Sequence, residues 1–406
     1  MGNNQSEEYP KPFLDSNNFY TMHSGINSES RDMSNHNQFS GNNGSFIKQS
    51  SDYIPTPLLK TMYHGVWSMV YPDSVPPLTR VGQCHVYDEE KNTIIIAYGC
   101  GIDGKCLNDA WALDLKSLTW RCISRKLRSP RQYASAVLIK KRMFIFGGIC
   151  DCQFFADLHY IDIDTGEVVV VNTEGEIPSP RTSPIFFCNS AKDTLFLWSG
   201  YTFDGLSDES AEFVSSLDLT MDTLQWQHFG QSFPGRASAS YCCHNSNHYI
   251  FGSTNTTGLL AFSEQTGDFK TINCTGSEPQ PDLNHTSMIS TDEYIFLIGG
   301  EATFNYMHLF ALDVKRKWWF AFHVRPDGES FATSDGIVNK LGLFMMPREF
   351  GASVVYNKEK REIVSVMGSR MMDPPPIFKI YIGEALGSIH MRSDMYEMFK
   401  RDISSF

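Results

Sequence analysis

A pair of strands recurs six times along this chain, and this repetition constrains the fold more than any other feature. In the stretch SPRQYASAVLIKKRMFIFGG, residues 129–148, an alternating strand, a basic turn and a second apolar strand end in two adjacent glycines. The copies follow one another at intervals near 50 residues. Such a period, built from short strands, predicts the blades of a β-propeller. The six copies of the first strand begin at Arg80, Arg131, Arg181, Arg236, Asn284 and Arg348.

Each copy continues with a third strand, which carries a Leu-Asp or Ile-Asp pair or its remnant, and five copies have a fourth strand opened by an aromatic or branched residue. The sixth copy stops after its third strand, but a matching fourth strand, HGVWSMVY with Trp67, precedes the first copy. We therefore expect the Trp67 strand to pair with the strand at residues 377–382 and close the ring, which would protect sheet edges. The other fourth-strand residues are Trp120, Val168, Trp226, Phe269 and Trp318.

These motifs resemble the kelch repeat family over about residues 62–383. The double glycine of that repeat is intact in two copies, at Gly147-Gly148 and Gly299-Gly300. The resemblance implies an all-β fold, a six-bladed kelch-type β-propeller with N-terminal strand ring closure. In the remaining copies the doublet is degraded to Gly99-Cys100, Ser199-Gly200, Gly252-Ser253 and Gly368-Ser369.

Three regions follow from the change in composition along the chain. Residues 1–52 are rich in Asn and Ser and have no apolar period, so they predict a disordered N-terminal tail that cannot bury enough surface to offset its ordering entropy. Residues 53–383 are assigned to the propeller. Residues 384–406 contain no proline and carry scattered apolar side chains, which predicts a short C-terminal helix or tail.

The overall charge and the cysteine content limit the cellular setting. A net charge of -12 opposes nucleic-acid binding, which needs concentrated Lys and Arg. The sequence has no apolar run of about 18 residues, the length that predicts a membrane-spanning helix, and its N-terminus lacks the apolar region of a secretory signal. The 10 cysteines are then expected in a reducing compartment, where disulfides are rare. We expect a cytoplasmic monomer.

A propeller does not by itself identify a function. The sequence contains no Gly-x-Ser-x-Gly elbow, Walker loop or dinucleotide-binding fingerprint. The leading hypothesis is a non-enzymatic scaffold that binds a protein or peptide and needs no cofactor. The alternative is a propeller enzyme of the galactose-oxidase-like type, a copper enzyme with Tyr and His ligands. The 12 histidines do not fall at matching repeat positions, so no copper ligand set can be nominated.

The arginines at the starts of the first strands lie in the connections between consecutive blades. Two interpretations of them remain open. They could form a partial basic ring for an acidic peptide, or each could pair with a local acceptor and stabilise the connection. In kelch family members the inter-blade loops and the loops after the second strands form a common partner-binding face. The resemblance places the loops at residues 202–212, 302–306 and 325–348 on that face. The candidate partner-binding residues are Arg80, Arg131, Arg181, Arg236 and Arg348.

Four cysteines follow the second strands of two adjacent blades, in the segments YGCGIDGKC and GGICDC. Loops in corresponding positions of a propeller lie on the same face, so the four thiols could approach one another and hold zinc, which accepts four thiolates. The simpler interpretation is that they are small packing residues in a reducing compartment. The candidate metal ligands are Cys100, Cys106, Cys150 and Cys152.

The first six residues, MGNNQS, match the N-myristoylation pattern, with Gly2 as the acceptor after removal of Met1. One myristoyl chain gives only marginal, reversible membrane binding. The acidic Glu7 and Glu8 stand where basic residues would add a second anchor. The pattern therefore predicts a cytoplasmic protein that samples a membrane surface through Gly2.

Overall fold

The computed structural model of the chain describes residues 65–203, 212–252, 258–279, 284–301, 306–307, 309–330, 337–338, 344–347, 351–368 and 373–382. Every regular element among these residues is a β-strand. No helix in these ranges is long and apolar enough to cross a membrane. The predicted N-terminal tail, the predicted C-terminal helix and Gly2 lie outside the described residues.

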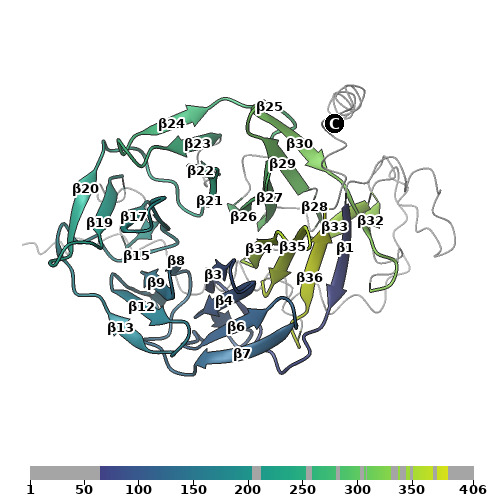
Figure 1. Cartoon of the computed structure of the whole chain (residues 1–406), viewed down its shortest axis with the longest axis horizontal. Coiled ribbons are helices and arrows are strands. Elements are labelled where there is room, and N and C mark those ends of the chain that lie inside the picture. The colour runs from purple at the N-terminus through teal and green to yellow at the C-terminus, as the bar shows by residue number, and fades with distance from the viewer. Residues whose placement is uncertain are drawn as a thin grey trace, which may run out of the picture.

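Six antiparallel sheets stand in a ring, so the predicted six-bladed propeller is confirmed (Figure 1). Within each blade the first strand lies nearest the centre and the fourth lies at the rim. Blade 1 contains β3 (Cys84–Asp88), β4 (Thr93–Ala97), β6 (Ala110–Asp114) and β7 (Thr119–Ser124). Blade 2 contains β8 (Ser135–Ile139), β9 (Arg142–Phe146), β12 (Leu158–Asp162) and β13 (Val168–Val170).

The same strand order holds in the remaining blades. Blade 3 contains β16 (Ile185–Cys188), β17 (Thr194–Trp198), β19 (Val214–Asp218) and β20 (Gln225–Phe229). Blade 4 contains β21 (Ser240–His244), β22 (Asn247–Phe251), β23 (Leu259–Phe262) and β24 (Phe269–Ile272). Blade 5 contains β26 (Asn284–Ser290), β27 (Tyr294–Glu301), β29 (Leu309–Asp313) and β30 (Trp318–Phe322). Blade 6 contains β34 (Ser353–Asn357), β35 (Glu362–Val366), β36 (Ile377–Tyr381) and β1 (Gly65–Val70).

The ring closes through the N-terminal strand, as the sequence predicted. Strand β1 pairs antiparallel with β36, and Trp67 stands opposite Ile380. The Trp67 side chain is buried among residues of blades 5 and 6, including Phe322 and Ile380. One blade is therefore assembled from the two ends of the domain, so no blade carries a free end strand where the ring begins.

The hydrophobic core is divided among the interfaces between adjacent blades. Strand β4 shows why its sequence is apolar on both faces: Ile94 and Ile96 pack with Val364 of blade 6, whereas Ile95 packs with Ile145 of blade 2. Successive side chains of a strand point to opposite faces, so a strand between two neighbouring blades buries both sets.

The fourth-strand tryptophans are buried, and one of them is displaced by a residue from its predicted position. Trp226 stands opposite Leu217, and the equivalent pair in blade 5 is Trp319 with Leu312. Trp319 is buried, while Trp318 is only half-buried. The prediction of Trp318 was therefore wrong by one residue, because two adjacent tryptophans cannot be distinguished without the strand pairing.

The glycine doublet also has a different register in two blades. The reference doublet, Gly147-Gly148, has φ angles of 74° and 100°, and Tyr98-Gly99 repeats them with 62° and 103°. In blade 6 the corresponding residues are Met367, at 63°, and Gly368, at 101°. The predicted doublets Gly99-Cys100 and Gly368-Ser369 were therefore one residue too far along the chain.

Candidate functional site

The connections between blades and the loops after the second strands meet at one end of the ring, which we call the loop face. The connection strand β2 (Arg80–Val81) pairs with β5 (Cys100–Gly101), and β15 (Arg181–Thr182) pairs with β18 (Tyr201–Thr202). In blade 2 a single bridge joins Gln132 to Ile149 of β10 (Ile149–Cys150), which itself pairs with β11 (Gln153–Phe154). These small ladders hold the loops of the face against the ends of the blades.

The arginines that open the first strands lie beneath this face, with their side chains buried. Arg80 and Arg131 are 0% and 1% exposed, and Arg181 is equally buried. Each donates to the carbonyl oxygen of the first doublet residue in the same blade, at 3.0–3.1 Å, and those acceptors are Tyr98, Gly147 and Ser199. Each also donates from Nε to a carbonyl two residues earlier in the chain. The repeated arginine and the repeated doublet are therefore parts of one hydrogen-bond arrangement.

Two of these arginines pair with an aspartate that precedes the third strand. Arg80 Nη1 lies 2.6 Å from Asp109 Oδ1, and Arg131 Nη1 lies 2.6 Å from Asp157 Oδ1. The sequence reading missed both aspartates, because it recorded only the Asp inside the third strand. The signal was present as an acidic residue directly before the strands AWALD and LHYID.

A buried network extends from Arg131 across the interface between blades 1 and 2. Asp157 Oδ2 lies 3.1 Å from His159 Nδ1, and His159 Nε2 lies 2.8 Å from the Tyr98 hydroxyl. Burial lowers the pKa of His159 despite the nearby carboxylate, so the imidazole is neutral. Burial favours the neutral acid at Asp157, but the His159 and Arg131 side chains outweigh it and hold the pKa of that carboxyl below its usual range.

The second interpretation, local pairing that stabilises the connection, accounts for these contacts. Arg236 is also buried; its Nη1 donates to the Gly258 carbonyl at 2.7 Å. Arg348 lies outside the described residues. Direct binding of a partner by Arg80, Arg131 or Arg181 would require these bonds to open, and that role stays a prediction.

Exposed apolar side chains occupy the surface of the loop face. Ile102 and Phe203 directly follow β5 and β18 and therefore occupy equivalent positions in blades 1 and 3; they are 60% and 63% exposed. Leu78 precedes β2 by two residues and is 65% exposed. Large apolar side chains that stay exposed contribute little to the stability of the fold, which makes them candidates for contact with another molecule.

The cysteine loops come together only in part. Cys100 and Cys106 face each other in an antiparallel bridge, and Cys106 Sγ donates to the Ile149 carbonyl, next to Cys150. Burial raises the pKa of Cys100 to about 11 and also raises the pKa of Cys106 and Cys150. In the described ranges no three or more His, Cys, Asp or Glu side chains are arranged to hold a metal ion. Cys152 is exposed, and the four-cysteine zinc site stays a prediction.

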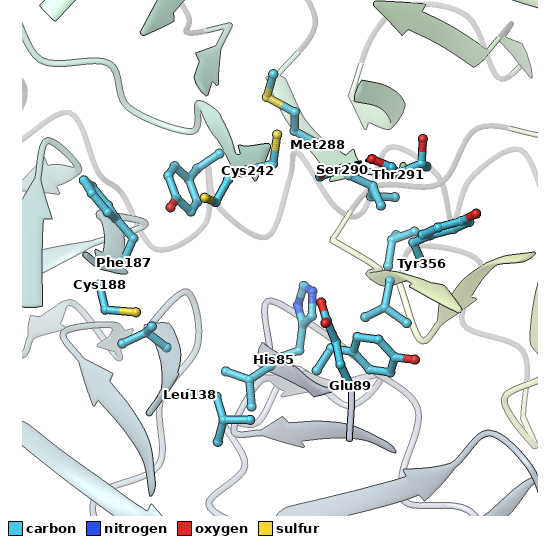
Figure 2. A pocket seen from close by; sticks show the side chains of 18 of the residues that line it. His85, Glu89, Leu138, Phe187, Cys188, Cys242, Met288, Ser290, Thr291 and Tyr356 are labelled. Atoms are coloured by element: carbon cyan, nitrogen blue, oxygen red, sulfur yellow. Dashed lines mark hydrogen bonds between the residues drawn. The ribbon is translucent and has the colours of Figure 1, made fainter. Parts of the chain in front are cut away.

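A cavity of about 1040 Å³ lies at the centre of the ring and is lined by the first strands of all six blades. Figure 2 shows His85, Cys188 and Tyr356 around it, contributed by three different blades. Its lining includes Glu89 and Asp292, in the turns after first strands. Because these turns lie at the opposite end of each blade from the doublets, the cavity opens away from the loop face.

A polar chain beside the cavity connects blades 3 and 4. The Tyr241 hydroxyl lies 2.8 Å from His248 Nδ1, and His248 Nε2 lies 3.1 Å from Glu264. Glu264 accepts a hydrogen bond from the Ser190 backbone N–H in blade 3 at 2.8 Å. Burial raises the pKa of Tyr241 well above its usual value, so the phenol stays protonated. These hydrogen bonds connect the two blades, and Tyr241 presents a neutral hydroxyl rather than an ionised group to the cavity.

Comparison with known proteins is consistent with this architecture. Kelch domain-containing protein 3 of Rattus norvegicus is 28% identical over 220 residues, which are 49% of this chain and 55% of that protein. Acyl-CoA-binding domain-containing protein 4 of Arabidopsis thaliana is 29% identical over 163 residues, 39% of this chain and 23% of that protein. Host cell factor 1 of Homo sapiens is 31% identical over 148 residues, 31% of this chain and 7% of that protein.

This chain spans about a quarter of the length of the two plant relatives that it matches, acyl-CoA-binding domain-containing proteins 4 and 5. A family model, the KLHDC2/KLHL20/DRC7 Kelch-repeats domain, matches residues 43–192 and 151–336. Together these two matches extend over more than half of the sequence and over most of the blades described above. The chain therefore belongs to the kelch-repeat family described as the KLHDC2/KLHL20/DRC7 Kelch-repeats domain.

Proposed function

We propose that this protein is a non-enzymatic interaction scaffold that binds a protein or peptide partner on its loop face. The observation that carries the proposal is the exposure of Ile102 and Phe203 at equivalent loop positions, with the exposed Leu78 two residues before β2. The ladders β2–β5 and β15–β18 hold these loops, so the apolar side chains stand on a fixed surface. Kelch propellers are typical of protein-interaction scaffolds, which supports the assignment.

The four described arginines act in this proposal as positioning residues rather than as the contact surface. In blades 1 and 3 the guanidinium groups of Arg80 and Arg181 bond the doublet carbonyls of Tyr98 and Ser199 and thereby hold the loops that carry Ile102 and Phe203. Binding of an acidic peptide directly by the arginines would depend on their charge. A partner bound by the exposed apolar residues would instead be sensitive to loss of apolar area.

Substitution of the exposed apolar residues tests the proposal. Proteins that co-purify with the full-length chain from its native cells would be quantified for the wild type and for the double variant Ile102→Asp, Phe203→Asp. The matched control is Met221→Asp, because Met221 is 59% exposed but lies in the turn between β19 and β20, at the opposite end of blade 3. We expect the double variant to lose partners that the control keeps. Equal recovery from all three proteins would contradict the loop-face assignment.

Cytoplasmic location with reversible membrane sampling through Gly2 is the second part of the proposal. The match of MGNNQS to the acylation pattern supports it, and the net charge of -12 argues against tight binding to anionic lipid. Intact-mass measurement of the native protein should show a mass increase that corresponds to one myristoyl group. An unmodified N-terminus, together with the same cell fractionation for wild type and Gly2→Ala, would remove the membrane role and leave the loop-face proposal intact.

A further inference from the structure

Most blades carry an additional segment along the outer edge of the fourth strand. In blades 3, 5 and 6 this segment forms a short parallel strand: β14 (Glu174–Gly175) pairs with β20, β25 (Thr275–Gly276) with β30, and β31 (Val324–Pro326) with β1. In blade 1 the Ser74 side chain takes this place, because its hydroxyl accepts a hydrogen bond from the Trp120 N–H at 2.6 Å. The fold therefore has a standard way of covering its rim strands.

The covering segments all bind the backbone at the fourth-strand tryptophan. Glu176 N–H donates to the Trp226 carbonyl at 2.9 Å, Ser277 N–H to the Trp319 carbonyl at 2.8 Å, and Asp327 N–H to the Trp67 carbonyl at 3.0 Å. The tryptophan position has other residues in blades 2 and 4, namely Val168 and Phe269, which stand opposite Ile161 and Phe262. No described residue covers the fourth strand in these two blades.

The lengths of the connections explain the difference. The connections that enter blades 2 and 4 are residues 125–130 and 230–235, whereas the one that enters blade 3 and contains β14 is residues 171–180. A short connection has too few residues to run along the rim before it turns inward. In blade 2 the covering would have to come from the end of β7 in blade 1. That end reaches only the turn between β12 and β13, where an added Cβ at Gly166 would meet the Ile123 carbonyl oxygen. Beyond that point no described residue pairs with or hydrogen-bonds to the outer edge of β13.

The backbone groups that face outward on β13 can be identified from its inner hydrogen bonds. Val171 N–H donates to the Leu158 carbonyl and the Glu167 carbonyl accepts from Asp162 N–H, both at 2.9 Å. Because backbone groups alternate along a strand, Val168 and Val170 direct their N–H and C=O groups away from the sheet. Val170 is 43% exposed, and no described residue bonds to these groups.

The two uncovered edges differ in chemistry. Strand β13 and the next residue read Val-Val-Val-Val, which has high strand propensity and no charge. Strand β24 carries the exposed Lys270, and a charged lysine on an edge opposes pairing with another strand. The edge of β13 is therefore open and apolar, while the edge of β24 is protected.

We propose that the edge of β13 is a docking site for an extended segment of a partner protein, which adds to blade 2 as a parallel strand. The occupant is identified by the molecule itself, because β14, β25 and β31 are extended segments that cover the equivalent edge in parallel. Main-chain hydrogen bonds to Val168 and Val170 would provide most of the recognition, as in other cases of strand addition. This site lies on the rim and is separate from the loop face.

The test uses the full-length protein and a synthetic peptide with the sequence of residues 172–180, NTEGEIPSP, the segment that covers blade 3. Hydrogen exchange at residue resolution should show several-fold slower exchange of the Val168 and Val170 amides when the peptide is added at millimolar concentration. Val170→Pro should abolish this protection at Val168, because it removes an outward N–H without touching the bonds to β12. Val170→Lys, which keeps the N–H and adds an edge charge, should weaken it.

The matched control is Thr271→Pro, the equivalent outward position on β24, which should leave peptide protection of β13 unchanged. Absence of protection on β13, or equal protection of β13 and β24, would overturn the proposal. Two other occupants would also overturn it. A wild-type dimer that becomes a monomer with Val170→Pro would identify a second copy of the chain. Protection of Val168 and Val170 in the free protein that disappears on deletion of residues 1–64 would identify the chain's own N-terminal segment.

Discussion

The two residues that end each second strand have positive φ angles, but they tolerate side chains differently. The first has φ between 62° and 82° and is Tyr98, Ser199 or Met367 in three blades. The second has φ between 97° and 103° in the five blades where it is described, and there it is always glycine. The left-handed region near 60° admits other residues at modest cost, whereas the region near 100° is largely restricted to glycine.

This difference predicts the effect of a single methyl group. Gly148→Ala should lower the free energy of unfolding by about 1–3 kcal/mol, because φ is 100° and the added Cβ would lie 2.9 Å from the Gln132 carbonyl oxygen. The control Lys140→Gly, at an exposed turn with φ of 55°, should be neutral or stabilising. Urea unfolding midpoints measure both. Equal effects of the two substitutions would show that backbone strain does not set the glycine requirement.

Arg131 and Arg128 offer a direct comparison of a buried and an exposed charge that share the Asp157 carboxylate. Arg131→Ala should destabilise the protein by about 3–5 kcal/mol, since it leaves the Gly147 carbonyl without its donor and removes the buried partner of the Asp157 carboxylate. Arg128→Ala should cost less than about 1 kcal/mol, because that side chain is 40% exposed. If Arg131→Ala kept full stability and lost a partner, the partner-binding interpretation of the arginines would be favoured instead.

His159 predicts how stability depends on pH. Its pKa in the folded protein lies below the ordinary value of about 6.5, so the unfolded chain takes up the proton first as the pH falls. The contribution of neutral His159 is thus present above pH 6.5 and is lost below it, at up to about 1.4 kcal/mol per pH unit. The low pKa of Asp157 adds a further loss, which begins only as the pH falls toward about 4. His159→Gln should flatten the decrease in unfolding free energy between pH 6.5 and 5, and an unchanged slope would assign the decrease to other groups.

At the scale of the strand, β1 decides whether the ring is closed. Trp67 packs against Phe322 of blade 5 and Ile380 of blade 6. Trp67→Ala should therefore lower the free energy of unfolding by about 3–5 kcal/mol. Ser68→Ala, at the neighbouring position whose side chain points to the other face of the same strand, should have little effect. Thermal denaturation of the two variants separates these outcomes, and a wild-type midpoint for Trp67→Ala would contradict the closing role of β1.

At the scale of the strand, two kinds of position predicted from the sequence differ by one residue from those in the structure. The copies of the repeat and their order could be recognised because each strand carries its own apolar pattern. The choice between Trp318 and Trp319, or between Tyr98-Gly99 and Gly99-Cys100, depends on which backbone atoms pair across the sheet. Adjacent residues of similar chemistry carry no local signal of that pairing.

At the scale of the whole molecule, closure makes each blade a neighbour of two others. The six apolar clusters lie between blades, so no blade has a complete core of its own. We expect one cooperative unfolding transition, in which Trp67→Ala in blade 6 and Asp157→Asn in blade 2 lower the same midpoint. Tryptophan fluorescence and circular dichroism should report coincident transitions for each variant. Separate transitions, with only one of them shifted by each substitution, would show that the blades unfold independently.

The sequence by itself determined the number of blades, the closing strand and the positions of the repeated arginines, because each leaves a periodic pattern in the order of residues. Only the tertiary structure decided what those arginines do. Their acceptors, such as Gly147 and Asp157, are separated from Arg131 by a strand or more, and burial of the guanidinium depends on the loops above it. The separation of the loop face, the central cavity and the open edge of β13 was likewise undetermined by the sequence. These features arise from which strand ends meet in the closed ring, and that is a property of three-dimensional packing rather than of local pattern.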